Sequence, residues 1–127
     1  MPNLYTKQAD SISYPNLIAG TSIPIEIRSV TLQAGQGILK RGTVVGIITA
    51  SNLAVKVDSS KNDGSQTADS ILTDDVDTTG ATNVVATAYS SGLFNRRALL
   101  FGGTDTAAKH ETRLRELGIF LKDNIPY

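Results

Sequence analysis

The chain has 127 residues and a mass of 13.5 kDa, which suits one domain with one hydrophobic core. Twelve basic and twelve acidic residues give a formal charge of zero, so no net field attracts nucleic acid or an anionic membrane. The absence of cysteine excludes disulfides, thiol nucleophiles and thiolate metal sites, and no apolar run approaches the ~20 residues that span a bilayer.

The first 22 residues are polar and are interrupted by Pro2, Pro15 and Gly20, so they bury too little surface to offset the entropy of ordering. They also lack the apolar core of a signal peptide, and we expect a soluble chain that is not exported. Two interpretations stay open: a frayed terminus, which composition favours, or an arm that orders on a partner. We therefore separate a flexible arm, residues 1–22, from a single β-rich domain, residues 23–127.

A strand-like pattern begins after the arm, in residues 23–32. Its isoleucines stand at odd positions, whereas Val30 and Leu32 stand at even ones. A change of parity inside a strand requires a bulge or a bend, which we place near Arg28 and Ser29.

A β-hairpin is predicted in residues 43–57. The β-branched run at 43–49 favours a strand. Residues 53–57 alternate, which puts Leu53, Val55 and Val57 on one face and Lys56 on the other. The three residues between the strands are few enough for an antiparallel turn. The glycines where we expect turns or close backbone approach are Gly35, Gly37, Gly42 and Gly46.

Shorter elements follow. The sequence predicts a turn at 62–64, a buried strand at Ile71 and Leu72, a polar loop at 77–83 and a strand at 84–89. A turn is expected at 90–92, then an apolar piece at Leu93 and Phe94. Residues 98–101 are apolar throughout, which predicts burial on both faces.

One helix is predicted between Gly103 and Gly118. Thr104 or Asp105 can cap its first amides, and Gly118 suits a left-handed C-terminal cap. Its expected apolar face consists of Ala107, Ala108, Leu114 and Leu117. Glu111 and Arg115 form a favourable i,i+4 pair, and residues 119–121 return to a short strand.

The residue types that carry catalysis are sparse. His110 is the one histidine, so a catalytic triad lacks any other imidazole base, and we interpret His110 as an ordinary helical residue. Asp74, Asp75 and Asp77 indicate a solvated loop rather than a cation site. Residues 58–64 do not match a calcium loop, because serine and lysine stand where carboxylates belong.

Glycines and basic pairs give no stronger signal. The Gly35 to Gly37 stretch is too short for a dinucleotide fingerprint. The glycines at 102–103 fit a strand-to-helix turn better than an anion site. The pairs at 40–41 and 96–97 are interpreted as surface turn residues, because no aromatic stacking platform accompanies them. We therefore expect no enzyme, no cofactor, no metal and no nucleic-acid partner.

Four blocks of the sequence resemble, in order and spacing, the bacteriophage head decoration proteins of the lambda type. They cover much of residues 30–122 and are GILKRGTVVGIIT (37–49), DGSQTADSILTDDVD (63–77), SSGLFNRRAL (90–99) and LRELGIFLK (114–122).

The resemblance implies a mainly β fold with one short C-terminal helix, built as a β-clip-like bent ribbon or incomplete barrel and assembled as a homotrimer. It implies binding to the major capsid protein at three-fold or quasi-three-fold points on the exterior of an expanded capsid, after synthesis in the host cytoplasm. The family has no catalytic residues to transfer. The arm becomes the expected capsid contact, and its proposed anchors are Leu4, Tyr5, Ile12, Tyr14 and Leu17.

Two other classes of function stay open. A small β binding module, such as a glycan-binding or adhesion domain of a phage particle, requires an exposed aromatic platform, for which Tyr89, Phe94 and Tyr127 are few and scattered. A trimeric β-clip nucleotide hydrolase requires acidic and phosphate-binding motifs that the sequence does not contain.

Overall fold

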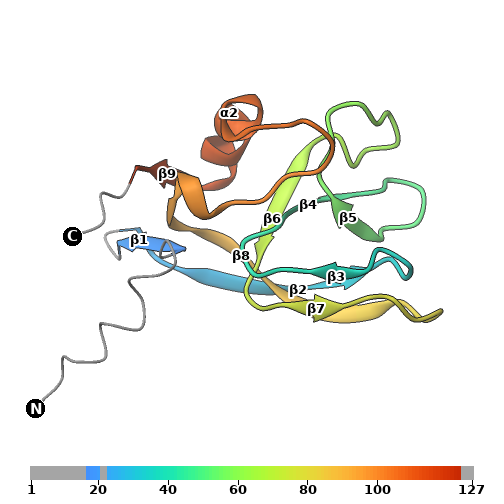
Figure 1. The fold of residues 1–127 in the computed structure, drawn as a ribbon. Helices are drawn as coiled ribbons and strands as arrows, with labels where there is room; N and C mark the ends of the chain where they lie inside the picture. The colour runs from blue at the N-terminus through green and yellow to red at the C-terminus, as the bar shows by residue number, and fades with distance from the viewer. Residues whose placement is uncertain (1–16, 21–22, 124–127) are drawn as a thin grey trace, which may run out of the picture.

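The computed structural model describes residues 17–20 and 23–123, and within them it is mainly β with one α-helix (Figure 1). The elements in chain order are β1 (Ile18–Gly20), β2 (Glu26–Leu32), β3 (Ile38–Leu39), β4 (Val44–Ile47), β5 (Ala54–Lys56), β6 (Ala68–Leu72), β7 (Val76–Asp77), β8 (Val84–Asn95), the 3₁₀ turn η1 (Arg96–Ala98), α2 (Ala107–Leu117) and β9 (Ile119–Lys122).

Five strands form a small, partly closed barrel. The hydrogen-bonded order β8–β2–β5–β4–β6 returns to β8, because β6 also pairs with β8. Every pairing in this ring is antiparallel except that of β2 with β5. The β2–β5 junction consists of a single Cα pair, Leu32 with Ala54, so the barrel is incomplete there.

The barrel interior is filled by alternate residues of its strands, as the two-residue period of a strand requires, together with Leu39 of β3. The buried members are Val30, Leu32, Leu39, Val45, Ala54, Leu72 and Ala88. Two of the seven are alanines, which suits the narrow space that five strands enclose.

A second core lies outside the barrel wall. Val44 and Ile71 belong to it, whereas their chain neighbours Val45 and Leu72 point into the barrel. The helix α2 and strand β9 cover this outer core, which also contains Leu114 of α2 (Figure 1). The same β4 and β6 strands therefore support two cores, one on each face.

The predicted hairpin is confirmed, with a change in which residue is buried. Strands β4 and β5 are antiparallel and pair Val45 with Lys56. Ala54 is completely buried because it faces Leu32 across the barrel seam, whereas Leu53 and Val55 are half-buried. A Cβ on Gly46 would lie 2.8 Å from the Thr67 carbonyl oxygen, which accounts for a glycine in this strand.

The predicted turn at 90–92 is wrong, because β8 continues through it as one strand of 12 residues. Its first part pairs with β2, and its last part pairs with β1 and β9. The strand bends where it changes partners, and Gly92 there adopts a φ of 146°. The register irregularity lies at Glu26 and Ile27, where β8 contributes the extra residue Ser90, rather than near Arg28.

Residues 98–101 also differ from the prediction. Ala98 ends the turn η1, and Leu99 is extended and buried in the outer core. Leu100 is 42% exposed and forms a β-bridge with Thr43. The small β3–β7 sheet in the polar middle of the chain was not predicted, since two-residue strands carry almost no periodic signal.

The helix ends where expected, and it begins one or two residues later than expected. Gly118 has a φ of 93° and its N–H donates to the carbonyl oxygens of Arg115 and Leu114. The N-cap is Thr106 rather than Thr104 or Asp105. Its buried face is formed by His110 and Leu114, whereas the predicted Ala108 is exposed.

Candidate functional site

The base of the N-terminal arm lies inside the domain. Leu17 is 3% exposed and packs in the outer core, and its carbonyl oxygen accepts a 2.7 Å hydrogen bond from the Asn95 amide. Ile18 of β1 pairs with Phe94 of β8. Of the five proposed capsid anchors, Leu17 is therefore a core residue, while Leu4, Tyr5, Ile12 and Tyr14 lie outside the described residues.

Both ends of the described chain meet at one end of β8. Phe94 pairs with Ile18 of β1 on one side and with Leu121 of β9 on the other. Figure 1 shows β1 and β9 close together at this end, away from the β4–β5 hairpin. Leu17, where the described chain begins, therefore also lies at this end of the domain.

A buried polar cluster joins three separate segments. Both carboxylate oxygens of Asp105 accept hydrogen bonds from Ser59, at 2.7 Å from its amide and 2.6 Å from its hydroxyl. The Nε2 atom of His110 lies 2.6 Å from Asp105 Oδ2, and Phe101 stacks on the imidazole at 5.5 Å. The Asp105 and His110 side chains are 3% and 5% exposed.

This cluster corrects the interpretation of His110 as an ordinary helical residue. Burial alone would raise the pKa of Asp105, but the hydrogen bonds from Ser59 and His110 outweigh it and lower that pKa to about 2. Asp105 is therefore ionised at neutral pH and holds the loop after β5 against α2. The signal in the sequence was the position of His110 on the same helical face as Leu114.

The arrangement is not a hydrolase triad. In a triad the imidazole stands between the carboxylate and the hydroxyl, so that it can take the serine proton. Here Asp105 stands between Ser59 and His110, and the hydroxyl donates to the carboxylate. We assign the cluster a structural role.

The acidic residues after β6 bond groups of the protein itself. Asp75 accepts a 2.7 Å hydrogen bond from the Arg41 amide, and its carboxylate lies 3.8 Å from Lys40 Nζ. Bonds from the Thr79 hydroxyl and amide lower the pKa of Asp77. In residues 17–20 and 23–123, no three histidine or acidic side chains converge in a way that could hold a metal ion.

The glycines before α2 approach a carboxylate rather than an open anion site. A Cβ on Gly103 would lie 2.9 Å from both Asp58 carboxylate oxygens. Asp58 itself accepts bonds from the Ser60 amide and hydroxyl, which lower its pKa. An external anion here would meet the charge of Asp58.

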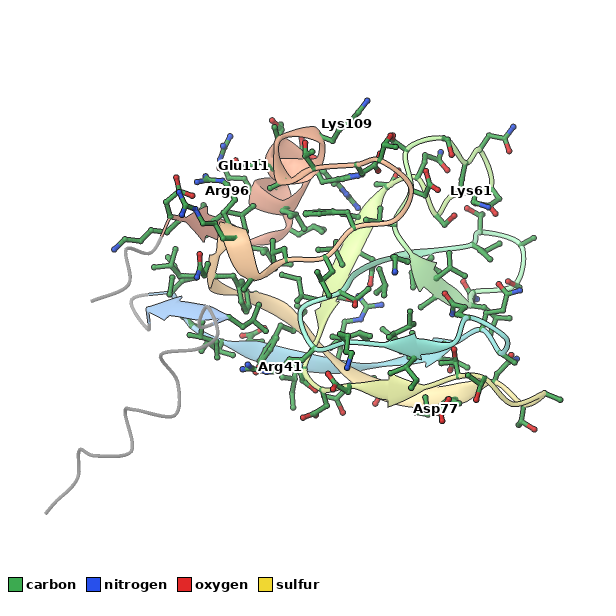
Figure 2. All side chains as sticks on the ribbon, in the orientation of Figure 1. Arg41, Lys61, Asp77, Arg96, Lys109 and Glu111 are labelled. Carbon is green, nitrogen blue, oxygen red and sulfur yellow. The ribbon has the colours of Figure 1, made fainter. Side chains whose placement is uncertain are left out.

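Arg96 was predicted to be a surface turn residue, and the structure places it at the centre of an ion-pair network. Its guanidinium bonds both carboxylate oxygens of Glu111, at 2.6 and 3.2 Å, and reaches Asp123 at 2.9 Å (Figure 2). The hydrogen bonds to Glu111 raise the pKa of Arg96 most, and the hydrogen bond to Asp123 raises it further. Arg96 thereby ties η1 to α2 and to the end of β9, whereas Arg97 is exposed as predicted.

A groove of about 490 Å³ lies between the turn at Gln36, strand β5 and the loop 58–65. Lys56 and Lys61 line it together with Asp58 and Asp63. Bonds from the Ser65 hydroxyl and amide lower the pKa of Asp63. Charges of both signs line the groove, so it favours no single class of charged ligand.

Three aromatic residues were considered for a glycan platform, and the two that the structure describes are not exposed. Phe94 is completely buried and the half-buried Tyr89 packs against it, with ring centroids 5.2 Å apart. Tyr127 lies outside the described residues.

A family model described as "Bacteriophage lambda head decoration protein D" matches residues 7–120, nearly the whole chain. No curated protein matches the sequence. In the part of the chain that the structure describes, no helix is long and apolar enough to cross a bilayer.

Proposed function

The chain belongs to the bacteriophage lambda head decoration protein D family, and we propose that it binds as a homotrimer to the outer surface of an expanded phage capsid and stabilises the shell. A structural role at the phage head follows from family membership, and the match over residues 7–120 is the observation that carries the proposal. The bent β8 ribbon and the incomplete barrel support assigning the fold to the β-clip type.

The proposed contact with the major capsid protein is the arm, which we now limit to residues 1–16. Leu4, Tyr5, Ile12 and Tyr14 remain its proposed anchors. Leu17 is no longer proposed as an anchor, because it is buried and accepts a hydrogen bond from Asn95. It attaches the arm to the domain core. We propose that the end of the domain carrying β1 and β9 faces the shell.

A trimer makes such an arm effective. A segment that orders on binding loses conformational entropy, so a single arm binds weakly. Three arms on one trimer bind as a linked set, which raises avidity by on the order of 10² or more. A trimer that binds the expanded lattice and not the unexpanded one stabilises the expanded state by mass action.

The test is co-sedimentation of the purified protein with undecorated shells of its own phage, unexpanded and expanded. We expect saturable binding to expanded shells, at a copy number that matches the three-fold positions. Binding to neither form would refute the proposal, and a reproducible hit on a glycan array would then favour the adhesion alternative.

A second experiment tests the arm. Deletion of residues 1–16 should leave the domain folded, because Leu17 and β1 are kept. The same deletion should abolish retention on shells, because it removes the proposed contact. The matched control is Leu17→Ala, which should lower the thermal stability of the domain and leave the arm intact. Full saturation of shells by the truncated protein would exclude the arm as the contact.

A further inference from the structure

Strand β2 has an open edge. Along one side, all seven of its residues from Glu26 to Leu32 pair with β8. Along the other side, within the described residues, it pairs with β5 at Leu32 alone. The backbone from Glu26 to Thr31 therefore presents unpaired groups at the barrel seam, which is a ready template for another strand.

The edge is regular enough to accept a strand. The irregularity in the β2–β8 pairing leaves Ser90 of β8 as the extra residue, while β2 itself continues without interruption. A regular edge can continue a sheet, whereas a bulged one bends away from a new partner.

The outward face beside this edge is uncharged. Ile27 is 61% exposed and Ile25 is 37% exposed. The next outward pair on the ribbon is Ser29 with Thr87. Depletion of charge beside exposed isoleucines is typical of the centre of a protein contact.

The charges on the edge indicate which partner fits. Glu26 and Arg28 flank Ile27 with opposite signs. If a second β2 pairs antiparallel about Ile27, Glu26 of each copy stands opposite Arg28 of the other. The contact then contains two Glu26–Arg28 pairs. Two like charges would repel across such a pair, so this segment complements itself. Among the described residues Arg28 forms one ion pair, with Asp69 at 3.6 Å, and the Arg28 side chain is half exposed.

We propose that two free copies of this protein associate through their β2 edges, antiparallel and centred on Ile27. The proposal goes beyond decoration of the capsid, since it concerns the protein before it reaches a shell. The contact covers an open strand edge that would otherwise recruit strands without selectivity. It is weak and reversible, because it is short and its ion pairs are exposed.

Cysteine cross-linking tests the register, and the chain offers a clean background because it has no cysteine. In the proposed pair, position 27 faces position 27 of the second copy, and position 25 faces position 29. We expect Ile27→Cys to form a disulfide dimer rapidly on mild oxidation. We expect Ile25→Cys and Ser29→Cys to cross-link when mixed and not separately. The matched control is Thr87→Cys, exposed on the same face but one strand away from the edge.

Reversing the charges of Glu26 and Arg28 tests the same contact without an introduced cysteine. Glu26→Arg places two arginines opposite each other, and it should weaken dimerisation in sedimentation equilibrium at least about tenfold. The double variant Glu26→Arg with Arg28→Glu restores opposite charges and should restore dimerisation. The exchange also removes the Arg28–Asp69 pair, so thermal unfolding of each variant is measured alongside.

Either of two results overturns the proposal. One is cross-linking of Ile27→Cys no faster than of Thr87→Cys. The other is a folded double variant that dimerises no better than Glu26→Arg. A trimer formed through other contacts would not produce the 27–27 disulfide, and binding to shells is measured separately by co-sedimentation, so the two proposals fail independently.

Discussion

The Ser59–Asp105–His110 cluster gives the sharpest prediction about stability. We consider the substitution Asp105→Asn, which keeps the shape of the side chain and removes its charge. The ordinary carboxyl value of 3.8 exceeds the pKa of about 2 in the folded chain, so folding favours the ionised form. That difference corresponds to about 2 kcal/mol of stability at neutral pH, which the variant should lose.

The dependence on pH has a definite sign. Because the folded pKa is below the ordinary value, the stabilisation is complete above about pH 4 and is lost as the pH falls toward 2. The gap between wild type and Asp105→Asn should therefore be widest at pH 7 and close near pH 2.

Guanidinium chloride denaturation at pH 7, 4, 3 and 2, at one protein concentration, measures this gap. The matched control is Asp77→Asn. Like Asp105, Asp77 accepts hydrogen bonds from the amide and the hydroxyl of one residue, here Thr79, but Asp77 is exposed. It should change the midpoint much less. Equal stability of Asp105→Asn and wild type at pH 7 would refute the reasoning, as would a gap that persists unchanged at pH 2.

Three further substitutions follow from packing and ion pairing. Gly46→Ala should cost about 1–3 kcal/mol in chemical denaturation, because the new methyl meets two backbone carbonyls, whereas Gly80→Ala meets open space and should be neutral. Leu72→Ala should cost about 2–5 kcal/mol, since Leu72 is completely buried in the barrel; a smaller loss would mean that the barrel collapses around the cavity. Arg96→Ala should cost about 1–2 kcal/mol of stability, because it removes both hydrogen bonds to Glu111 and leaves that carboxylate only the 3.7 Å contact with Arg115. The exposed Arg97→Ala should change the stability by under about 0.5 kcal/mol, and equal effects of the two would count against the network.

Local elements could be predicted from the sequence wherever their cause lies within a few residues. The β-branched run and the alternation after it predict the β4–β5 hairpin, because periodicity and turn length act over short distances. Gly118 marks the end of α2, because a left-handed cap depends on one residue. The family could be identified for a related reason, since four blocks in order are a property of the linear chain.

Errors arose where distant segments meet. The expected turn at 90–92 is continuous strand because β2, β1 and β9 all pair with β8 near it. The burial of Ala54 rather than Leu53 depends on Leu32, 22 positions earlier in the chain, which closes the barrel seam against it. A prediction based on alternation places residues on faces, but it does not say which face another strand will cover.

The residues with unexpected roles illustrate the same division. The sequence by itself determined the strands of the hairpin, the helix, the neutral charge and the family, since these depend on residue type and short spacing. Only the tertiary structure decided that Ser59 would meet Asp105 across 46 positions, that Arg96 would bind α2, and that β2 would keep an open edge. Those outcomes depend on how the sheet closes, because contacts between distant residues form only when the whole barrel brings their backbones together.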